Sequence, residues 1–250
     1  MKVLISDKLS QEGIDVLNNV DGIQIIYKTN LEPEDLKNEI RDVEALIVRS
    51  STQVTKEVLS EAKKLKIIGR AGIGVDNIDC SAATERGVIV INTPSGNATT
   101  TAEHTIAMLM SLSRHIPQAD RSMHQGAWEK SKFTGTEITG KVLGIFGFGN
   151  IGKIVADRAL GLRMRVLVSD PFLNEQIVAK HGFELVSNEV LFERSDYISV
   201  HVPLNETTHN LIDHKTIQTM KTGVSILNCA RGGIVNESAL LDGLNSGKIA

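Results

Sequence analysis

The stretch VLGIFGFGNIG, residues 142–152, decides the fold of this chain. A short apolar run leads directly into Gly147-Phe148-Gly149-Asn150-Ile151-Gly152, and an amphipathic helical pattern follows. In such a loop the first glycine allows a tight turn, the second lets the backbone approach a pyrophosphate, and the third lets helix and strand pack closely. The start of the helix then presents N–H groups and partial positive charge to phosphate oxygens.

An acidic residue follows at the position where this loop needs one. A second apolar run, residues 166–168, ends at Asp170, about twenty residues after the glycines. A carboxylate there holds the ribose diol of NAD and repels the additional phosphate of NADP. Arg163 and Arg165 precede the end of that strand, so we expect them to point elsewhere. The pattern predicts an NAD site, and the alternative is a glycine-rich turn with a surface aspartate.

Short apolar runs alternate with helix-length amphipathic stretches along the whole chain. The runs do not alternate with polar residues, which is typical of strands buried on both faces of a parallel sheet. The expected strands include residues 3–5, 45–48, 67–68, 88–91, 142–146, 166–168, 197–200 and 224–227, and the expected helices include 10–19, 33–40, 56–63, 100–114 and 151–160. This order predicts an α/β fold of doubly wound parallel sheets with right-handed crossovers.

The turn-forming residues 92–97 precede a long helical pattern and mark a domain boundary. A chain of 250 residues is near the upper limit for one hydrophobic core, so two domains are expected. We place them at residues 1–98 and 99–250, with a second loop over residues 125–139.

The composition excludes several classes of function. The net charge of -3 provides no basic field for nucleic acid or an anionic membrane, and no apolar run is long enough to cross a bilayer. The first residues lack the long apolar core of a signal peptide. Cys80 and Cys229 have no metal-ligand spacing and form at most one disulfide, so we expect no metal and a cytoplasmic location.

Other strand ends carry polar residues, and ligands of open α/β sheets bind beyond the carboxyl ends of strands. Arg231 lies between a strand and two glycines, where a guanidinium can bind a planar carboxylate; the alternative is a capping or surface arginine. His201 is either catalytic or a structural histidine, and the Pro203 that follows stops its strand beside an apolar wall. Arg49 and Arg70 either bind a phosphate or carboxylate or are surface arginines in turns.

Together these motifs resemble the family of D-isomer-specific 2-hydroxyacid dehydrogenases over essentially the whole chain. The landmarks are residues 48–50, 69–77, 92–97, 102–103, 128–139, 147–152, 170–171, 201–204 and 228–237. Residues 128–137 point to the phosphoglycerate branch of the family. The resemblance implies a flavodoxin-like substrate-binding domain and a Rossmann NAD-binding domain. Trp128 is expected to be a packing anchor at a dimer interface. Lys130 and Lys132 either reach the phosphate of the substrate across such an interface or are solvated, and we expect the latter.

The resemblance also implies a reaction, the oxidation of 3-phosphoglycerate by NAD to 3-phosphohydroxypyruvate, which is the first step of L-serine biosynthesis. Arg231 would be catalytic, because it binds the substrate carboxylate and polarises the C2 oxygen. The implied cofactor contacts are Gly147, Gly149, Asn150, Ile151, Gly152, Asp170, Ile73, Val202, Pro203, Cys229, Ala230 and Arg231. The implied substrate contacts are Arg49, Ser50, Arg70, Gly72, Gly74 and Asn97, the last of which is equally explained by turn chemistry.

Members of the family associate, so the resemblance implies a homodimer or homotetramer. The family's catalytic glutamate and histidine follow the arginine at a distance that takes them beyond Ala250, and none of the seven histidines matches the catalytic position. We therefore expect both domains to be incomplete and this chain to turn over slowly. Two other functions remain open, a reductase of glyoxylate, hydroxypyruvate or another 2-keto acid, and an NAD-sensing binding protein of corepressor type.

Overall fold

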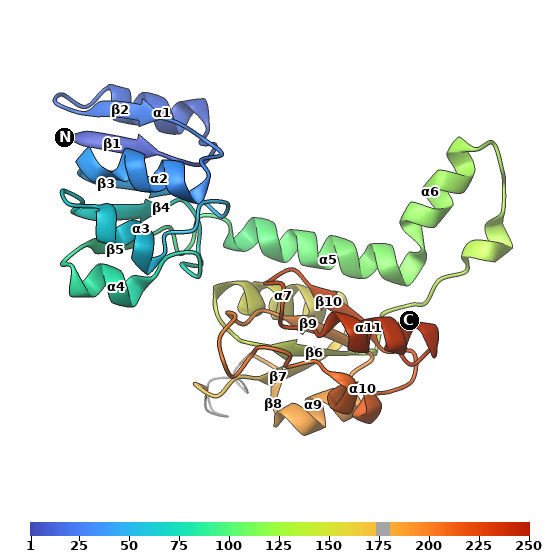
Figure 1. The fold of residues 1–250 in the computed structure, drawn as a ribbon. Helices are drawn as coiled ribbons and strands as arrows, with labels where there is room; N and C mark the ends of the chain where they lie inside the picture. Colours follow the sequence, from blue (N-terminus) through green and yellow to red (C-terminus); the bar gives the residue numbers. More distant parts are fainter. Residues whose placement is uncertain (174–180) are drawn as a thin grey trace. The chain divides into compact units, whose positions relative to one another are not determined.

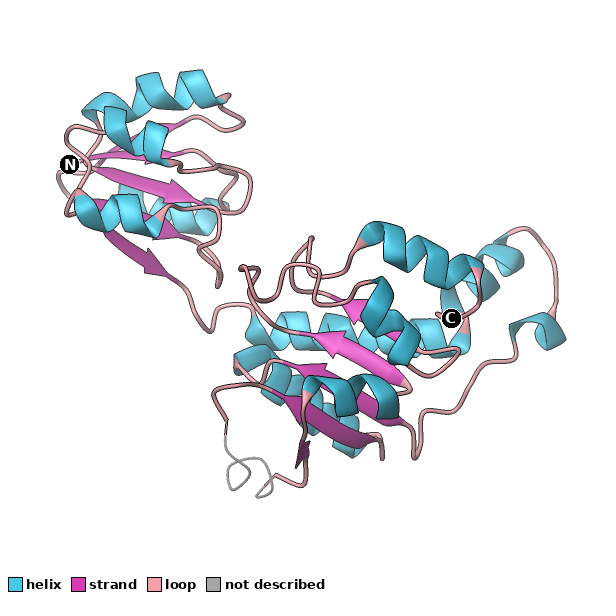
Figure 2. Ribbon diagram, turned by 60° about the horizontal axis from the view of Figure 1, so that its bottom comes forward, coloured by secondary structure: helices cyan, strands magenta, loops and turns pink. Residues whose placement is uncertain are grey.

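The computed structural model describes residues 1–173 and 181–250 and divides into two compact units, Met1–Asn97 and Ala98–Ala250. Each unit contains its own five-stranded sheet, and helices cover both faces of each sheet (Figures 1 and 2). The paired strands run parallel throughout both sheets. The predicted α/β fold with two doubly wound parallel sheets is thus confirmed.

The first unit has the strand order β2-β1-β3-β4-β5, which is the flavodoxin-like order. Its strands are β1 (Lys2–Ile5), β2 (Gln24–Tyr27), β3 (Ala45–Val48), β4 (Ile67–Arg70) and β5 (Ile89–Asn92). Its helices are α1 (Gln11–Asn18), α2 (Pro33–Glu39), α3 (Lys56–Glu61) and α4 (Cys80–Glu85), with a 3-10 turn η1 (Ile40–Asp42).

The second unit has the order β10-β9-β6-β7-β8, in which the chain reverses direction across the sheet between β6 and β9, as in a Rossmann fold. Its strands are β6 (Val142–Phe146), β7 (Arg165–Ser169), β8 (Glu184–Leu185), β9 (Tyr197–Val200) and β10 (Ser225–Asn228). Its helices are α5 (Ala98–Arg114), α6 (Ile116–His124), α7 (Asn150–Gly161), α9 (Asn188–Arg194), α10 (His214–Thr219) and α11 (Glu237–Asn245), with a 3-10 turn η2 (Lys130–Phe133).

Burial explains why most of the apolar runs predicted strands correctly, although the edge strand β5 differs from the expectation and leaves Ile89 and Ile91 exposed. The consecutive residues Val3, Leu4 and Ile5 of β1 are all at most 1% exposed, so both faces of this strand are covered. The same holds for β9, where Ile198 and Val200 are fully buried and the intervening Ser199 is also buried. A parallel strand covered on both sides needs no polar face, which removes the alternation of an exposed sheet.

The sequence did not predict several elements, among them β2, α4, β8 and α6. The long helix α5 ends at Arg114 as expected, but α6 follows after the single residue His115. His115 has the left-handed backbone conformation, with a φ of 52°, and Pro117 lies in the first turn of the new helix. A left-handed residue ends a helix, and proline is tolerated at the start of the next one. Nothing in the pattern of apolar residues indicates this break.

None of the helices in the described parts of the chain combines the length and the apolar character that crossing a membrane requires.

Candidate functional site

The glycine loop connects β6 to α7 at the carboxyl edge of the second sheet. Gly149 is the N-cap residue of α7 and supplies no side-chain cap to the first turn of the helix. A Cβ atom built on Gly149 meets no heavy atom within 4 Å. The loop therefore offers backbone N–H groups next to open space, which is the arrangement that a pyrophosphate requires.

The two other glycines of the loop are needed for close packing. Gly147 has a positive φ of 87°, and a Cβ atom on it would lie 2.7 Å from the His201 carbonyl oxygen. A Cβ atom on Gly152 would lie 2.1 Å from the carbonyl oxygen of Gly147. The structure thus gives the three glycines the separate duties that the sequence predicts, a turn, an open approach and a tight helix contact.

Asp170 directly follows β7, and its carboxylate is held by backbone amides. The N–H of Phe148 in the glycine loop donates to Oδ2 at 2.8 Å, and the N–H of Phe172 donates to Oδ1 at 2.9 Å. Each carboxylate oxygen has a further lone pair for a hydroxyl donor. The loop and the acid are therefore fixed to each other, as they must be to hold the phosphates and ribose of one dinucleotide.

Arg163 and Arg165 lie at the other end of β7. Arg163 occupies the turn before the strand, with a positive φ of 59°, and Arg165 is the first residue of the strand. Arg165 and Asp170 lie at opposite ends of this extended segment, five residues apart, which corresponds to roughly 16 Å. Both arginines thus lie at the opposite end of the strand from Asp170, which agrees with an NAD site.

The carboxyl end of β9 brings His201, Val202 and Pro203 beside the glycine loop. Val202 lies next to Gly147, where a Cβ atom would be 2.9 Å from its Cγ1, and Pro203 is exposed. The carbonyl oxygen of Pro203 accepts a hydrogen bond from the Thr208 hydroxyl at 2.6 Å, which closes the turn after the strand. Val202 and Pro203 thus form an apolar border at this edge of the sheet.

His201 is a structural rather than an acid–base residue in this arrangement. The residue as a whole is partly exposed, but its Nδ1 is buried without a hydrogen-bond partner among the described residues, and its Nε2 contacts the Ser199 hydroxyl at 2.9 Å. Burial lowers the pKa of His201 from 6.5 to about 4. The ring is therefore neutral at neutral pH, and of the two interpretations left open by the sequence the structural one is favoured.

Arg231 follows β10 in a loop that is anchored on both sides. Asn228 accepts the Ala230 N–H at 3.1 Å and donates its Nδ2 to the Arg231 carbonyl oxygen at 2.8 Å. The Arg231 Nη1 donates to the Ala230 carbonyl oxygen at 2.9 Å. Cys229 and Ala230 are both half-buried in the same loop. These bonds place the arginine at the same carboxyl edge as the glycine loop, Asp170 and Val202.

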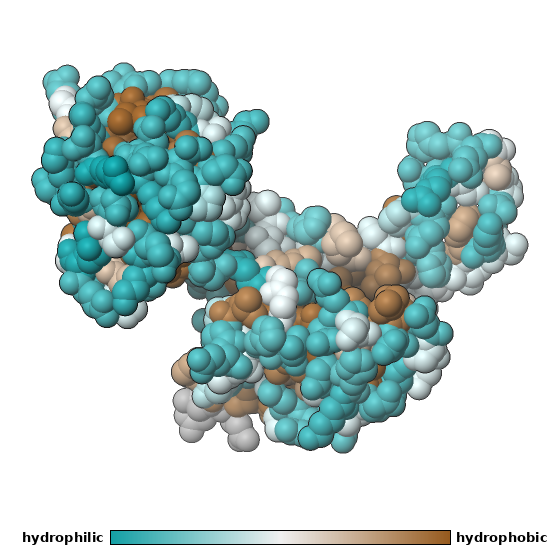
Figure 3. All heavy atoms as spheres, in the orientation of Figure 1, coloured by the Kyte–Doolittle hydropathy of each residue, from teal (hydrophilic) through white to brown (hydrophobic). Residues whose placement is uncertain are grey.

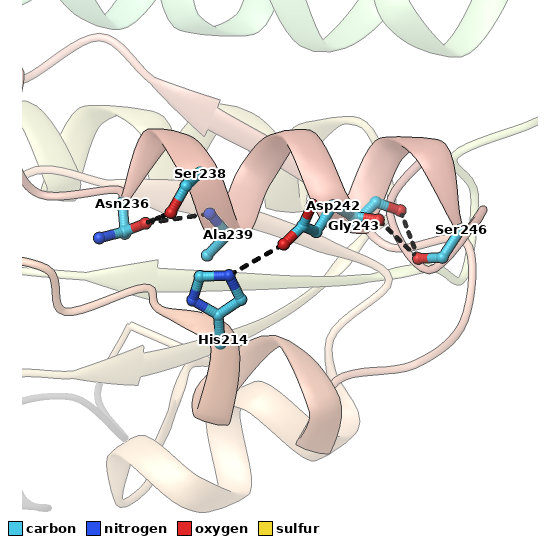
Figure 4. Close-up of polar contacts among 7 residues, drawn as sticks. All are labelled: His214, Asn236, Ser238, Ala239, Asp242, Gly243 and Ser246. Atoms are coloured by element: carbon cyan, nitrogen blue, oxygen red, sulfur yellow. Dashed lines mark hydrogen bonds and ion pairs between the residues drawn. The ribbon is translucent and has the colours of Figure 1, made fainter.

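The helix after this loop is fixed by its cap and by a neighbouring helix (Figure 4). The Asn236 side chain accepts the Ala239 N–H at 2.9 Å and caps the start of α11. The His214 Nε2 of α10 contacts the Asp242 carboxylate of α11 at 3.1 Å. These contacts fix α11, the helix that begins six residues after Arg231.

The substrate-site candidates of the first unit lie at the carboxyl ends of β3 and β4. Val48 pairs with Arg70 in the sheet, so Arg49 and Ser50 follow one strand beside the residue that ends the next. The Arg70 Nε donates to the Arg49 carbonyl oxygen at 3.2 Å. These contacts bring the two arginine residues together within this unit.

The remaining candidates of this unit follow the same two strands or lie at the end of the unit. Gly72, Ile73 and Gly74 are half-buried residues of the loop after β4, and the Asn92 side chain donates to the Ile73 carbonyl oxygen at 2.6 Å. A Cβ atom on Gly72 would fall 1.6 Å from the Arg70 Nη1, so the guanidinium lies over this glycine. Asn97 is exposed and is the last residue of the unit.

The structure adds two residues that the sequence did not single out, Asp7 and Asn77. Both are buried polar side chains, and both contact the backbone of the loop that carries Arg49. Their chemistry in the sequence is ordinary, and only their burial beside this loop distinguishes them. Among the described residues, no group of histidine, cysteine or acidic side chains is arranged to hold a metal ion.

A hollow of about 600 Å³ opens at the opposite, amino-terminal edge of the second sheet. Val142, Arg165 and Lys221 are among its lining residues, and it contains none of the predicted site residues. Ligands of open α/β sheets bind beyond the carboxyl ends of the strands, so the carboxyl edge rather than this hollow is the candidate site.

Comparison with known proteins identifies the family of this chain. Residues 106–250 match the family model described as "D-isomer specific 2-hydroxyacid dehydrogenase, NAD binding domain". The chain is 47% identical over 250 residues to D-3-phosphoglycerate dehydrogenase of Archaeoglobus fulgidus, covering 100% of this chain and 47% of that protein. The chain thus spans about half the length of the curated relatives it matches.

Solved structures agree with this match. The TT0316 protein from Thermus thermophilus superposes with a TM-score of 0.89 and 32% identity, covering 98% of this chain and 78% of that one. D-lactate dehydrogenase from Aquifex aeolicus, solved with NAD and lactic acid, gives a TM-score of 0.88 at 29% identity, covering 100% and 74%. The second unit of the present chain, with the glycine loop and Asp170 at one edge, corresponds to the NAD-binding domain of the matched family, and the chain belongs to the D-isomer specific 2-hydroxyacid dehydrogenase family.

Proposed function

We propose that this chain takes part in the NAD-dependent oxidation of 3-phosphoglycerate to 3-phosphohydroxypyruvate. The observation that carries the proposal is the pair Arg49 and Arg70 at neighbouring strand ends, in a chain that matches proteins named D-3-phosphoglycerate dehydrogenase over its whole length. A phosphate ester carries about two negative charges at neutral pH, and two guanidinium groups suit it in charge and in hydrogen-bond geometry.

The other residues take roles that follow from their positions. NAD, when bound, supplies the acceptor for the hydride that leaves C2. The first turn of α7 and Asp170 hold and orient its phosphates and ribose. Arg231 binds the substrate carboxylate and polarises the C2 oxygen. We do not assign the proton transfer to His201, because its Nε2 is occupied by Ser199 and its Nδ1 is buried.

A substrate comparison tests the proposal. We expect 3-phosphoglycerate to bind the chain in the presence of NADH about 100-fold more tightly than D-glycerate, because the lost phosphate contacts are charge-assisted. Arg70→Gln should remove most of this preference, whereas Arg41→Gln, which breaks an exposed ion pair with Glu61 in the same unit, should not. Titration calorimetry gives the affinities, and NADH formation with each acid gives the turnover.

Equal affinity for the two acids would reject a phosphoglycerate enzyme. Turnover of glyoxylate or hydroxypyruvate in preference to the phosphorylated acid would then identify a 2-keto acid reductase. Binding of NAD without oxidation or reduction of any acid by the full-length protein would instead identify a sensing protein.

We further propose a cytoplasmic homodimer whose interface includes residues 115–136 of the second unit. Figure 1 shows α6 and η2 standing away from the sheet of this unit, and Figure 3 shows apolar surface gathered over the carboxyl half of α5. Trp128 is 79% exposed, and Met123 and Ile116 are about half exposed. Exposed aromatic and methionine residues are typical of protein interfaces. Light scattering on the purified chain gives the mass, and a monomer at high concentration would reject this interface.

A further inference from the structure

The loop Arg49–Thr52 of the first unit is held by two buried polar side chains from other parts of the chain. Asp7, two residues after β1, is 5% exposed, and Asn77, after β4, is 7% exposed. Buried polar groups lose their hydration, so their hydrogen bonds decide where they and their partners lie. We call Asp7 and Asn77 together the loop clamp.

Asp7 binds the amide groups at both ends of the loop. The Arg49 N–H donates to Oδ2, and the Thr52 N–H donates to the same oxygen at 3.3 Å. The Thr52 hydroxyl donates to Oδ1 at 2.9 Å. Hydrogen bonds to a carboxylate are stronger than those between neutral groups, so this side of the clamp fixes both ends of the loop.

Asn77 binds the carbonyl groups of the same two residues. Its Nδ2 donates to the Arg49 carbonyl oxygen at 3.0 Å and to the Thr52 carbonyl oxygen at 2.7 Å. Its Oδ1 is buried without a hydrogen-bond partner among the described residues. A buried acceptor without a hydrogen bond costs stability. The two hydrogen bonds that Nδ2 donates are therefore the ones that orient the Asn77 side chain.

The clamp also determines where the Arg70 guanidinium lies. The Arg49 carbonyl oxygen that accepts from Asn77 accepts from the Arg70 Nε as well, at 3.2 Å. The guanidinium then extends over Gly72, where a side chain would collide with it. Movement of the Arg49 peptide group therefore moves both arginine residues.

We propose that Asp7 and Asn77 are positioning residues that preorganise Arg49 and Arg70 for the phosphate of the substrate. This inference rests on the proposed function, in which the two arginines bind a phosphate ester. The clamp residues do not contact the substrate. They act by holding the Arg49 peptide group, so that little conformational freedom is lost when a doubly charged anion binds.

Asn77→Asp tests the clamp, because it replaces the Nδ2 group, which donates to two carbonyl oxygens, by one carboxylate oxygen that can donate to neither. We expect the dissociation constant of 3-phosphoglycerate to rise about tenfold, while the dissociation constant of NAD changes less than about twofold. Asn38→Asp is the matched control, since it introduces the same charge outside the clamp, in α2 of the same unit. Where turnover is measurable, the Michaelis constant for 3-phosphoglycerate should rise with kcat unchanged.

Unchanged affinity for 3-phosphoglycerate in folded Asn77→Asp would overturn the proposal. Weakening of 3-phosphoglycerate and NAD to the same extent would also overturn it, because it would indicate general damage. If Asn77→Asp does not fold, Thr52→Val decides in its place. This variant keeps the shape of the side chain and removes the hydroxyl, which donates to Asp7 and also contacts Ser6 beside it. We expect a rise of about threefold or more in the same dissociation constant.

Failure of the clamp can be distinguished from failure of the proposed function. If the wild-type chain does not bind 3-phosphoglycerate, the proposed function fails and the positioning role fails with it, whatever the variants do. If the wild type binds it, hydrogen exchange of the Arg49 and Thr52 amides gives an independent test. Exchange should be faster in Asn77→Asp than in Asn38→Asp, and equal exchange in the two variants would overturn the clamp alone.

Discussion

Gly149→Ala is expected to leave the chain folded and to weaken NAD binding by about tenfold or more. The φ of Gly149 is -74°, which any residue can adopt, and an added Cβ meets no atom of the protein within 4 Å. Alanine is a poorer N-cap than glycine, so the second unit should lose less than about 1 kcal/mol of unfolding free energy. The methyl group would instead occupy the space where the pyrophosphate approaches the backbone.

Gly152→Ala is the comparison variant, and we expect its main effect on the stability of the second unit rather than on the approach of the pyrophosphate. Its Cβ would lie 2.1 Å from the Gly147 carbonyl oxygen, so the helix and the loop must separate. We expect a loss of about 3 kcal/mol in the unfolding free energy of the second unit. Urea unfolding and titration calorimetry with NAD measure the two quantities for both variants. Normal NAD affinity in Gly149→Ala would place the pyrophosphate elsewhere and remove the basis for the cofactor site.

Asp170→Asn should weaken NAD binding about 10- to 100-fold and reduce the discrimination between NAD and NADP. The carboxylate accepts backbone N–H groups with both oxygens, and an amide offers only one acceptor oxygen for the same partners. The loss of the negative charge also removes the repulsion of a 2′-phosphate, so the affinity for NADP should fall less than the affinity for NAD.

The control for this substitution is Asp157→Asn, which removes the same charge from an exposed position of α7. Fluorescence titration with NADH and NADPH gives the ratio of the two affinities for each variant. An unchanged ratio in Asp170→Asn would show that the acid does not face the ribose. The same change of ratio in Asp157→Asn would assign the effect to net charge rather than to contact.

Much of the second unit was predictable because its signals are local. The glycine loop, the strand before it and the acid after the next strand all lie within residues 142–170. Parallel strands place their carboxyl ends at one edge, so the sequence alone predicts Asp170, Val202 and Arg231 beside the loop. The structure places all three after strands of one sheet. Their contacts with cofactor and substrate remain predictions, which the variants above address.

Other features could not be predicted because they depend on burial. His201 had two interpretations in the sequence, and only the buried Nδ1 and the pKa of about 4 favour the structural one. The left-handed His115, which separates α5 from α6, has no signature in the apolar pattern. Glycine is the usual residue in that conformation, so a histidine at this position does not indicate the end of a helix.

By itself the sequence determined the α/β class and the parallel sheets and predicted where an NAD site lies, because apolar periodicity and motif spacing are properties of neighbouring residues. Only the tertiary structure decided how Arg49 and Arg70 are held. Asp7 reaches a loop 42 residues away, and Asn77 reaches the same loop from 28 residues on the other side. Buried groups so distant along the chain form hydrogen bonds only after the sheet has brought them together. No pattern of neighbouring residues therefore predicts these hydrogen bonds.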